Sequence, residues 1–133
     1  LHDALPIYAR QFQKYKQGAI AFIKSSQYNF YYSLALLAVF NKVSESQQQE
    51  YLKIVEANQQ QMKIWMDCCR ENFEHKYLLI SAEMARISGQ DLEAMELYDR
   101  AIDSAREHEF IQNEALANEL AAKFWLAKGN PQI

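Results

Sequence analysis

The absence of proline from the interior of the chain is the feature that most limits its fold. The only prolines are Pro6 and Pro131, and the only glycines are Gly18, Gly89 and Gly129. The residues between them are rich in Ala, Gln, Glu, Leu and Lys, which favour helix over strand. We therefore expect one all-α domain, and 133 residues are enough to bury a core.

The hydrophobic spacing predicts about six helices joined by short connections, so that neighbouring helices lie antiparallel. The first two are expected at 8–24 and 29–42, separated near Ser25 and Ser26. The first carries an apolar set, namely Phe12, Tyr15, Ile20 and Ile23. The second is apolar on most faces and should be the most buried element.

Capping signals predict where the later helices begin and end. Ser44 and Gln47 have the spacing of a capping box, and a break is expected at 67–71. Asn72 and Asp91 should cap the fourth and fifth helices, and the sixth should run from Phe110 to Gly129.

The segment that begins at Gly89 matches the tetratricopeptide (TPR) pattern. Ala94, Tyr98 and Ala101 follow the glycine at the spacing of that repeat. Glycine permits a left-handed turn, the alanines allow close helix contact, and the tyrosine fills the space between hairpins. Ala82 and Ala85 lie on the preceding helix, and Ala122 and Gly129 follow Ala82 and Gly89 by 40 residues. The expected fold is a TPR-like right-handed stack of antiparallel helical hairpins, an α-solenoid fragment with helices longer than usual.

Both ends of the sequence indicate a piece of a longer protein. Ala4–Ile7 has the sequence that a common sequencing adapter gives when translated, so residues 1–7 are expected to be a non-native leader. Residues 8–133 are then expected to be a helical-repeat segment.

Charge and composition exclude several classes of protein. The net charge of −3, the pI near 5.6 and the scattered basic residues argue against nucleic-acid binding. No apolar run is long enough for a membrane span, and no secretory signal is recognisable. The only cysteines, Cys68 and Cys69, are adjacent and suit a reducing compartment, so we expect a cytoplasmic protein.

Four phrases carry a closer resemblance. They read NFYYSLALLA at 29–38, ENFEHKYLL at 71–79, AMELYDRAI at 94–102 and NEALANELAAKF at 113–124. Together they resemble the helical-repeat region of the cyanobacterial-type multi-sensor histidine kinases, with Arg70 in place of a helix-opening proline of that family. The resemblance implies a parent kinase in which this region follows a Ser/Thr-kinase-like domain and an ATPase module and precedes a GAF domain and the kinase core.

The residues themselves offer no catalytic site. The P-loop, the kinase catalytic loop and the histidine phosphoacceptor box are missing from this chain. Glu71 and His75 could share a helix face as a metal or acid–base pair, but a solvated pair is favoured because no third ligand lies nearby. His108 suits a helix C-terminus, and His2 lies in the expected leader.

The remaining conspicuous side chains are interpreted as structural. Cys68 and Cys69 lack the spacing of a redox or metal site and are expected to be buried or partly buried. Core packing is favoured over a peptide groove for the aromatic cluster Tyr28, Phe30, Tyr31 and Tyr32. The glutamine triplets at 47–49 and 59–61 are expected to be solvated, and Trp65 and Trp125 to pack between hairpins.

The sequence therefore predicts a non-catalytic scaffold with no cofactor, metal or small-molecule substrate. Its partners would be neighbouring domains of a sensor kinase in phosphorelay signalling, or another protein. The alternative is a stand-alone TPR-like adaptor that binds a peptide or protein.

Overall fold

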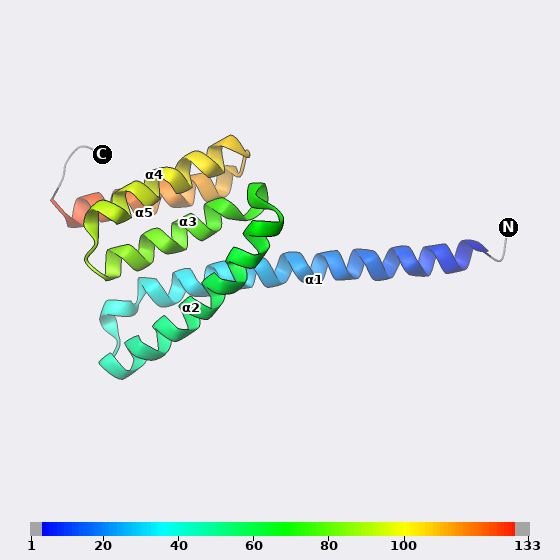
Figure 1. Ribbon diagram of the computed structural model, residues 1–133, viewed down its shortest axis with the longest axis horizontal. Helices are drawn as coiled ribbons and strands as arrows, with labels where there is room; N and C mark the ends of the chain where they lie inside the picture. The colour runs from blue at the N-terminus through cyan, green and yellow to red at the C-terminus, as the bar shows by residue number, and fades with distance from the viewer. Residues whose placement is uncertain (1–3, 130–133) are drawn as a thin grey trace.

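The computed structural model describes residues 4–129, which form a bundle of helices with one helix extending far beyond it (Figure 1). Its elements are α1 (Ala4–Ala38), the short 3-10 helix η1 (Phe40–Lys42), α2 (Glu45–Cys68), α3 (Arg70–Ile87), α4 (Asp91–Glu107) and α5 (Ile111–Ala127). These described residues contain no strand, so the all-α prediction is confirmed. Leu1–Asp3 of the expected leader lie outside the described residues, and the rest of it, 4–7, begins α1.

Antiparallel hairpins stack side by side to form what we call the body of the molecule. Each helix from α2 to α5 packs antiparallel against the next, most extensively α3 against α4, and the C-terminal half of α1 packs against α2 and α3. α3 is the central element because it contacts α1, α2, α4 and α5.

The predicted break near Ser25 and Ser26 is wrong, because α1 continues through both residues. The hydroxyl of Ser26 donates to the carbonyl of Ile23 at 2.8 Å, so the serine is satisfied inside the helix rather than at its end. The first two expected helices are therefore one. Residues 4–21, which we call the arm, project away from the body (Figure 1).

The most buried element is α3 and not the segment 29–42. Its buried side chains face several neighbouring helices and are Phe73, His75, Leu78, Leu79, Ile80, Ala82, Glu83 and Ala85. In the segment 29–42, Phe30 and Leu37 are buried, whereas Tyr31 and Val39 are exposed. The prediction fails because α1 lies at the edge of the stack and is covered on one side only.

Local signals explain most helix ends. Ser44 and Gln47 form the predicted capping box, each side chain accepting a hydrogen bond from the other's backbone N–H at 3.3 Å. Gly89 and Gly129 have φ of 75° and 71°, the left-handed conformation expected where a helix stops.

Two predicted caps are misplaced. α3 begins at Arg70, the position of the proline in the family phrase, and Asn72 lies inside that helix. Asp91 is the first residue of α4, whose N-cap is Gln90, and neither Cys69 nor Gln90 makes a side-chain capping bond. The start of α5 is as expected, with Phe110 as its N-cap.

The TPR pattern identifies residues of the contact between α3 and α4. Ala94, Tyr98 and Ala101 are all buried, as the pattern predicts, and so is Ala82. Ala122 is only partly buried, and the buried small residues of α5 are Ala117 and Ala121. The 40-residue offset therefore holds for the glycine turns but not for this alanine.

We predict that Ala101→Trp overpacks the α3–α4 contact. Ala101 is 1% exposed, so an indole there must displace its neighbours, at a cost of about 1–3 kcal/mol or more. Urea denaturation measures the free energy of unfolding. Arg100→Trp at the adjacent exposed position is the matched control and should change it little. Equal stability of the two variants would contradict the assignment of this face to the core.

Candidate binding groove

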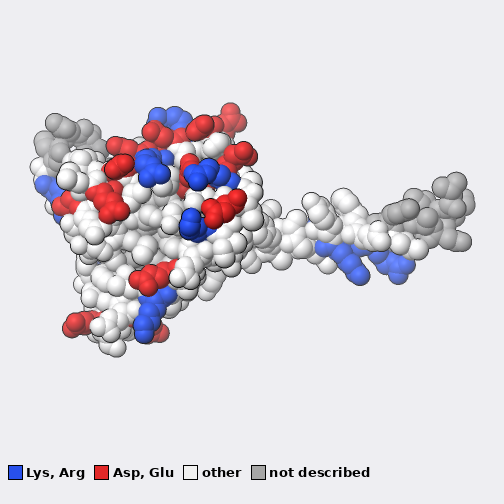
Figure 2. Space-filling model, viewed as in Figure 1, with Lys and Arg blue, Asp and Glu red and all other residues white. Residues whose placement is uncertain are grey.

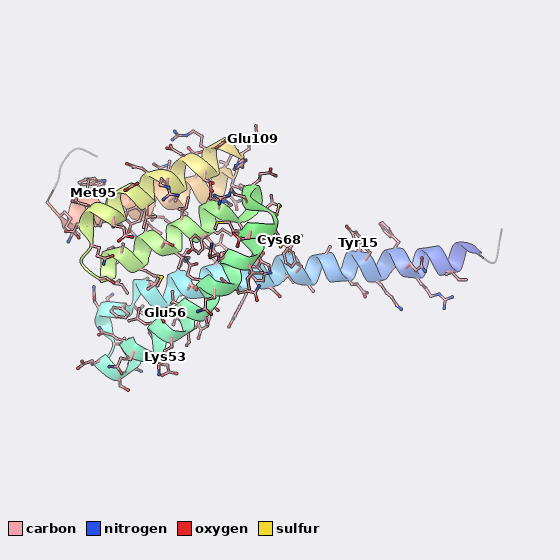
Figure 3. The ribbon with its side chains drawn as sticks, in the orientation of Figure 1. Tyr15, Lys53, Glu56, Cys68, Met95 and Glu109 are labelled. Carbon is pink, nitrogen blue, oxygen red and sulfur yellow. The ribbon has the colours of Figure 1, made fainter. Side chains whose placement is uncertain are left out.

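A groove of about 520 Å³ lies between α2 and α4 over α3. Carboxylates, a cation, amides, hydroxyls and apolar groups all line it, so its surface is partly polar and partly apolar. The lining residues are Glu56, Gln59, Gln60, Lys63, Tyr77, Ser81, Met84, Ala85, Ser88, Gln90, Glu93 and Leu97. Figure 3 labels Glu56 on α2, beside this groove.

Gln59 holds the α2 wall of the groove to α3. Its side-chain Nε2 donates to the carbonyl of Tyr77 at 3.1 Å and to the hydroxyl of Ser81 at 3.0 Å. Its Oε1 is buried and makes no hydrogen bond to the described residues. The expectation that the glutamine triplets are solvated is therefore wrong for Gln59, although Gln60 and Gln61 are exposed.

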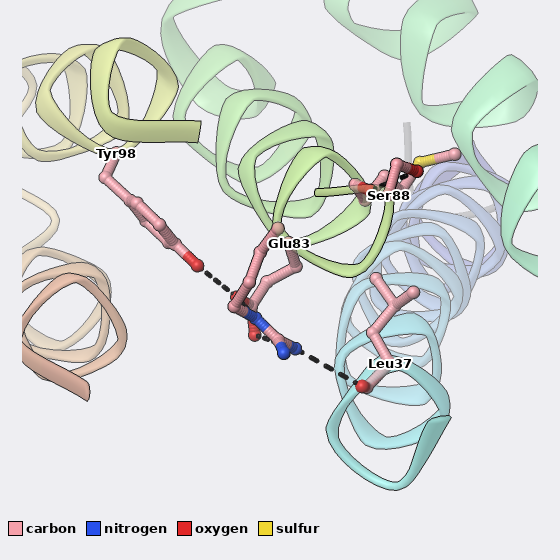
Figure 4. A network of polar contacts seen from close by, with 6 residues as sticks. Leu37, Glu83, Ser88 and Tyr98 are labelled. Atoms are coloured by element: carbon pink, nitrogen blue, oxygen red, sulfur yellow. Dashed lines mark hydrogen bonds and ion pairs between the residues drawn. The ribbon is translucent and has the colours of Figure 1, made fainter. Parts of the chain in front are cut away.

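A buried ionic network lies on the α1 side of α3 (Figure 4). Glu83, which is 3% exposed, accepts hydrogen bonds from the hydroxyl of Tyr98 and from Nε of Arg86, the latter at 2.8 Å. A second guanidinium nitrogen of Arg86 donates to the carbonyl of Leu37 at 3.3 Å. One carboxylate thus joins α3 to α4 and, through Arg86, to the end of α1.

The ionisation of this network follows from its surroundings. Burial and then the adjacent charge of Glu83 raise the pKa of Tyr98 well above its ordinary value, so the phenol stays protonated and donates. Burial opposes the charge of Arg86, but the hydrogen bond and the charge of Glu83 outweigh it and raise the pKa of the guanidinium. Sequence reasoning missed Glu83 because no single-sequence pattern marks which glutamate of a helix lies inside.

His75 is a core residue and not half of a solvated pair. It is 2% exposed, its ring stacks on Phe110 at 4.3 Å between centroids, and its Nε2 lies 2.9 Å from Nδ2 of Asn113. Glu71 is exposed, and no hydrogen bond or ion pair to His75 is seen among the described residues. Burial lowers the pKa of His75 to about 4, with the nearby charges of Lys76 and His108 acting in the same direction and Glu74 opposing.

The other candidate residues lie apart from the groove. Cys68 is exposed and Cys69 partly buried, both as free thiols, so the expected burial holds only for Cys69. His108 is the C-cap of α4, as its position suggested, and His2 lies outside the described residues. Between residues 4 and 129 no three His, Cys, Asp or Glu side chains are grouped as metal ligands require.

The aromatic residues divide between core and surface. Phe30 is buried and Tyr32 partly buried, but Tyr28 and Tyr31 are exposed, so core packing describes only part of this cluster. The Trp65 ring contacts Phe22 and Phe73 with centroids 5.5 and 5.9 Å away and so joins α1, α2 and α3. Trp125 is partly buried beside Phe124 on its own helix.

We predict that stability falls between pH 7 and pH 5 because the unfolded chain protonates His75 more readily than the folded chain does. The pKa of His75 is about 4 in the folded chain and 6.5 in the unfolded chain. Its contribution to the free energy of unfolding is therefore fully present above pH 6.5 and is lost as the pH falls toward 4. At pH 5 the loss is about 2 kcal/mol. Urea denaturation of the wild type and of His75→Phe at both pH values measures it.

The difference between the two proteins cancels the titration of groups that they share. His75→Phe keeps a ring against Phe110, so the variant should lose less stability on acidification, even if it is less stable at pH 7. The same loss in both proteins would exclude His75 as its source.

Comparison with known proteins identifies the repeat. The model of the family described as CHK1-like, TPR repeats matches residues 8–132. No curated protein and no solved structure matches the chain. Within the described residues no helix is long and apolar enough to cross a membrane. The family match covers almost the whole chain and agrees with the hairpin stack, so the chain belongs to the CHK1-like TPR repeat family.

Proposed function

We propose that this chain is a non-catalytic protein-binding scaffold that holds an extended segment of another domain or protein in the groove between α2 and α4. The observation that carries the proposal is the groove itself, which two hairpins of a repeat family form together. TPR stacks present such extended surfaces as a consequence of their curvature.

The chemistry of the groove suits a peptide backbone. Gln60 and Gln90 supply amides that can donate to or accept from main-chain groups. The hydroxyl of Ser81 accepts from Gln59 and can still donate, and that of Ser88 donates to the carbonyl of Met84 and can still accept. Apolar side chains such as Met84 and Leu97 provide area for the side chains of a ligand, and Met adapts its shape readily. Glu56 and Glu93 outnumber Lys63 as charged lining residues, which favours ligands with a basic residue.

We further propose that the parent protein is a large multi-sensor histidine kinase. The support is the resemblance of the four phrases quoted above to the helical region of those kinases. In that setting the stack would connect an ATPase module to the sensor and kinase domains downstream, and ligand binding in the groove would change how they are held.

A stand-alone adaptor is the second candidate. Its support is that the groove-lining residues all lie between 56 and 97, so the binding surface needs no other domain to complete it. Sequencing the source locus past both ends of the chain separates the two candidates. Flanking ATPase, GAF and kinase motifs in one reading frame would support the kinase, whereas a start and a stop codon around the chain would support the adaptor.

Binding in the groove is tested by two neighbouring glutamines of α2. A peptide is first selected from a random phage-displayed library on the immobilised chain. We predict that Gln60→Trp, which places a ring in the groove, weakens binding of that peptide at least about tenfold, or ~1.4 kcal/mol. Fluorescence anisotropy gives the Kd.

Gln61→Trp is the matched control, because Gln61 is equally exposed but does not line the groove. Its Kd should stay near that of the wild type. If the selected peptide has the same Kd for Gln60→Trp as for the wild type, the binding surface lies elsewhere. A library that yields no ligand would count against peptide binding altogether.

A further inference from the structure

The groove between α2 and α4 carries two carboxylates that no cation of the described chain neutralises. Glu56 lies on α2 and Glu93 on α4, and both are exposed. Neither forms an ion pair within residues 4–129. The one cation among the lining residues, Lys63, is itself 3.9 Å from the carboxylate of Asp67 on the same helix. The groove therefore holds unbalanced negative charge.

The helices that form the two walls carry an excess of acidic residues. α2 contains four Asp or Glu against two Lys, and α4 contains six Asp or Glu against two Arg. α1, by contrast, contains no Asp or Glu. Figure 2 shows the acidic side chains gathered over α4. A face of one charge attracts a partner of the opposite charge and steers its approach, so the face that holds the groove favours a basic ligand.

Hydrogen bonds to α3 fix how α2 and α4 are placed along the groove. Gln59 of α2 bonds to Tyr77 and Ser81, so it lies level with about residue 79 of α3. Tyr98 of α4 bonds to Glu83 and lies level with it. Because α3 runs antiparallel to both neighbours, a step toward the C-terminus of α2 or α4 is a step toward the N-terminus of α3. Each lining residue of the two walls can therefore be assigned a level along α3.

In this register the charges follow one another in the order Lys63, Glu56, Glu93. The first two lie four residues after and three residues before Gln59, and are level with about residues 75 and 82 of α3. Glu93 lies five residues before Tyr98 and is level with about residue 88. At about 1.5 Å per residue the two glutamates are about 9 Å apart along the groove, and Lys63 is about 10 Å beyond Glu56.

The spacing of the two glutamates matches the geometry of an extended chain. Such a chain advances about 3.3 Å per residue, so about three residues span the distance between them. Side chains alternate between the two sides of an extended chain, and residues three positions apart therefore point to opposite sides. Glu56 and Glu93 lie on opposite walls of the groove. Two basic residues at this spacing thus reach one glutamate each.

The wall between these charges also has an acceptor that lacks a donor. Gln59 lines the groove and is 8% exposed, and its Nε2 is used in bonds to α3. Its Oε1 has no hydrogen-bond partner in the described part of the chain. A donor from a ligand would remove the cost of that unpaired acceptor. Main-chain N–H groups and basic side chains are donors, so the missing partner agrees with the unbalanced charge.

We propose that the segment held in this groove is basic, with two Lys or Arg residues three positions apart, one at Glu56 and the other at Glu93. This inference rests on the proposed function, because it names what the groove selects. Lys63 repels a further basic residue at the other end of the groove, so the order of the charges also sets where the segment lies. Glu56 and Glu93 are then the residues that determine specificity.

Charge reversal in the protein is the first test. The peptide selected from the random library on the immobilised chain is labelled with fluorescein, and anisotropy gives its Kd. It should contain two basic residues three positions apart. Glu56→Lys and Glu93→Lys should each raise the Kd at least about fivefold, because attraction becomes repulsion. Glu96→Lys is the matched control, since Glu96 is exposed on α4 but does not line the groove, and its effect should stay below about twofold.

Charge reversal in the peptide tests the pairing itself. Each of the two basic residues is replaced in turn by Glu, and both changed peptides should bind the wild type weakly. One of them should regain affinity toward Glu56→Lys only, and the other toward Glu93→Lys only. A loss of helix stability in a variant cannot produce such a rescue, so the test does not depend on the variants being as stable as the wild type.

The outcomes separate this inference from the proposed function. Peptides that bind the wild type and lose affinity for Gln60→Trp, but contain no such basic pair, would overturn this inference and leave the proposed function standing. Equal weakening by Glu93→Lys and Glu96→Lys, with no rescue by the changed peptides, would also overturn it, because only the total charge would then matter. Binding that Gln60→Trp leaves unchanged would overturn the proposed function and this inference together.

Discussion

The buried carboxylate of Glu83 is the interaction on which the arrangement of the helices depends. A charge inside a protein is costly unless it is paired, and here the hydroxyl of Tyr98 and the guanidinium of Arg86 supply the pairing. Arg86 also donates to the carbonyl of Leu37 in the last turn of α1, where helix carbonyls lack partners and a cation is favoured. Removing Arg86 would leave the buried carboxylate without its cation, which typically costs about 3–5 kcal/mol. The network therefore fixes α1 and α4 on α3.

The same helix determines the shape of the groove. α3 faces the ionic network with Glu83, and it faces the groove with Tyr77 and Ser81. Gln59 of α2 bonds to both of these groove residues, while Tyr98 of α4 bonds to Glu83. Thus α2 and α4 are each tied to α3 by hydrogen bonds with defined geometry, and the width of the groove between them follows from those bonds. Apolar packing alone would leave more freedom in that spacing.

Sequence reasoning succeeded where the signal is local. Gly89 requires a backbone that other residues seldom adopt, and Ser44 with Gln47 forms bonds within one turn, so both were predictable without knowledge of distant residues. Ala94, Tyr98 and Ala101 were predictable because a repeat imposes the same steric demand in every unit.

Sequence reasoning failed where the burial or hydrogen bonding of a residue depends on its neighbours in space. Ser26 resembles a helix end, but its hydroxyl is satisfied within α1. His75 and Gln59 have polar side chains that suggest solvent, yet Asn113 and the α3 residues Tyr77 and Ser81 provide buried partners for them. Phe12 has the spacing of a core residue, but the arm extends beyond the helices that would have covered it. None of these neighbours can be read from one sequence.

The two halves of α1 differ in how strictly one face of the helix selects a partner. In the body that face includes Asn29 and Ser33, which bond to Asn58 of α2 at 3.0 and 3.1 Å. Buried polar groups of this kind accept only the register that satisfies them, so they specify α2 as the partner. The arm has aromatic and small residues at the equivalent positions and no polar group that demands one fixed partner.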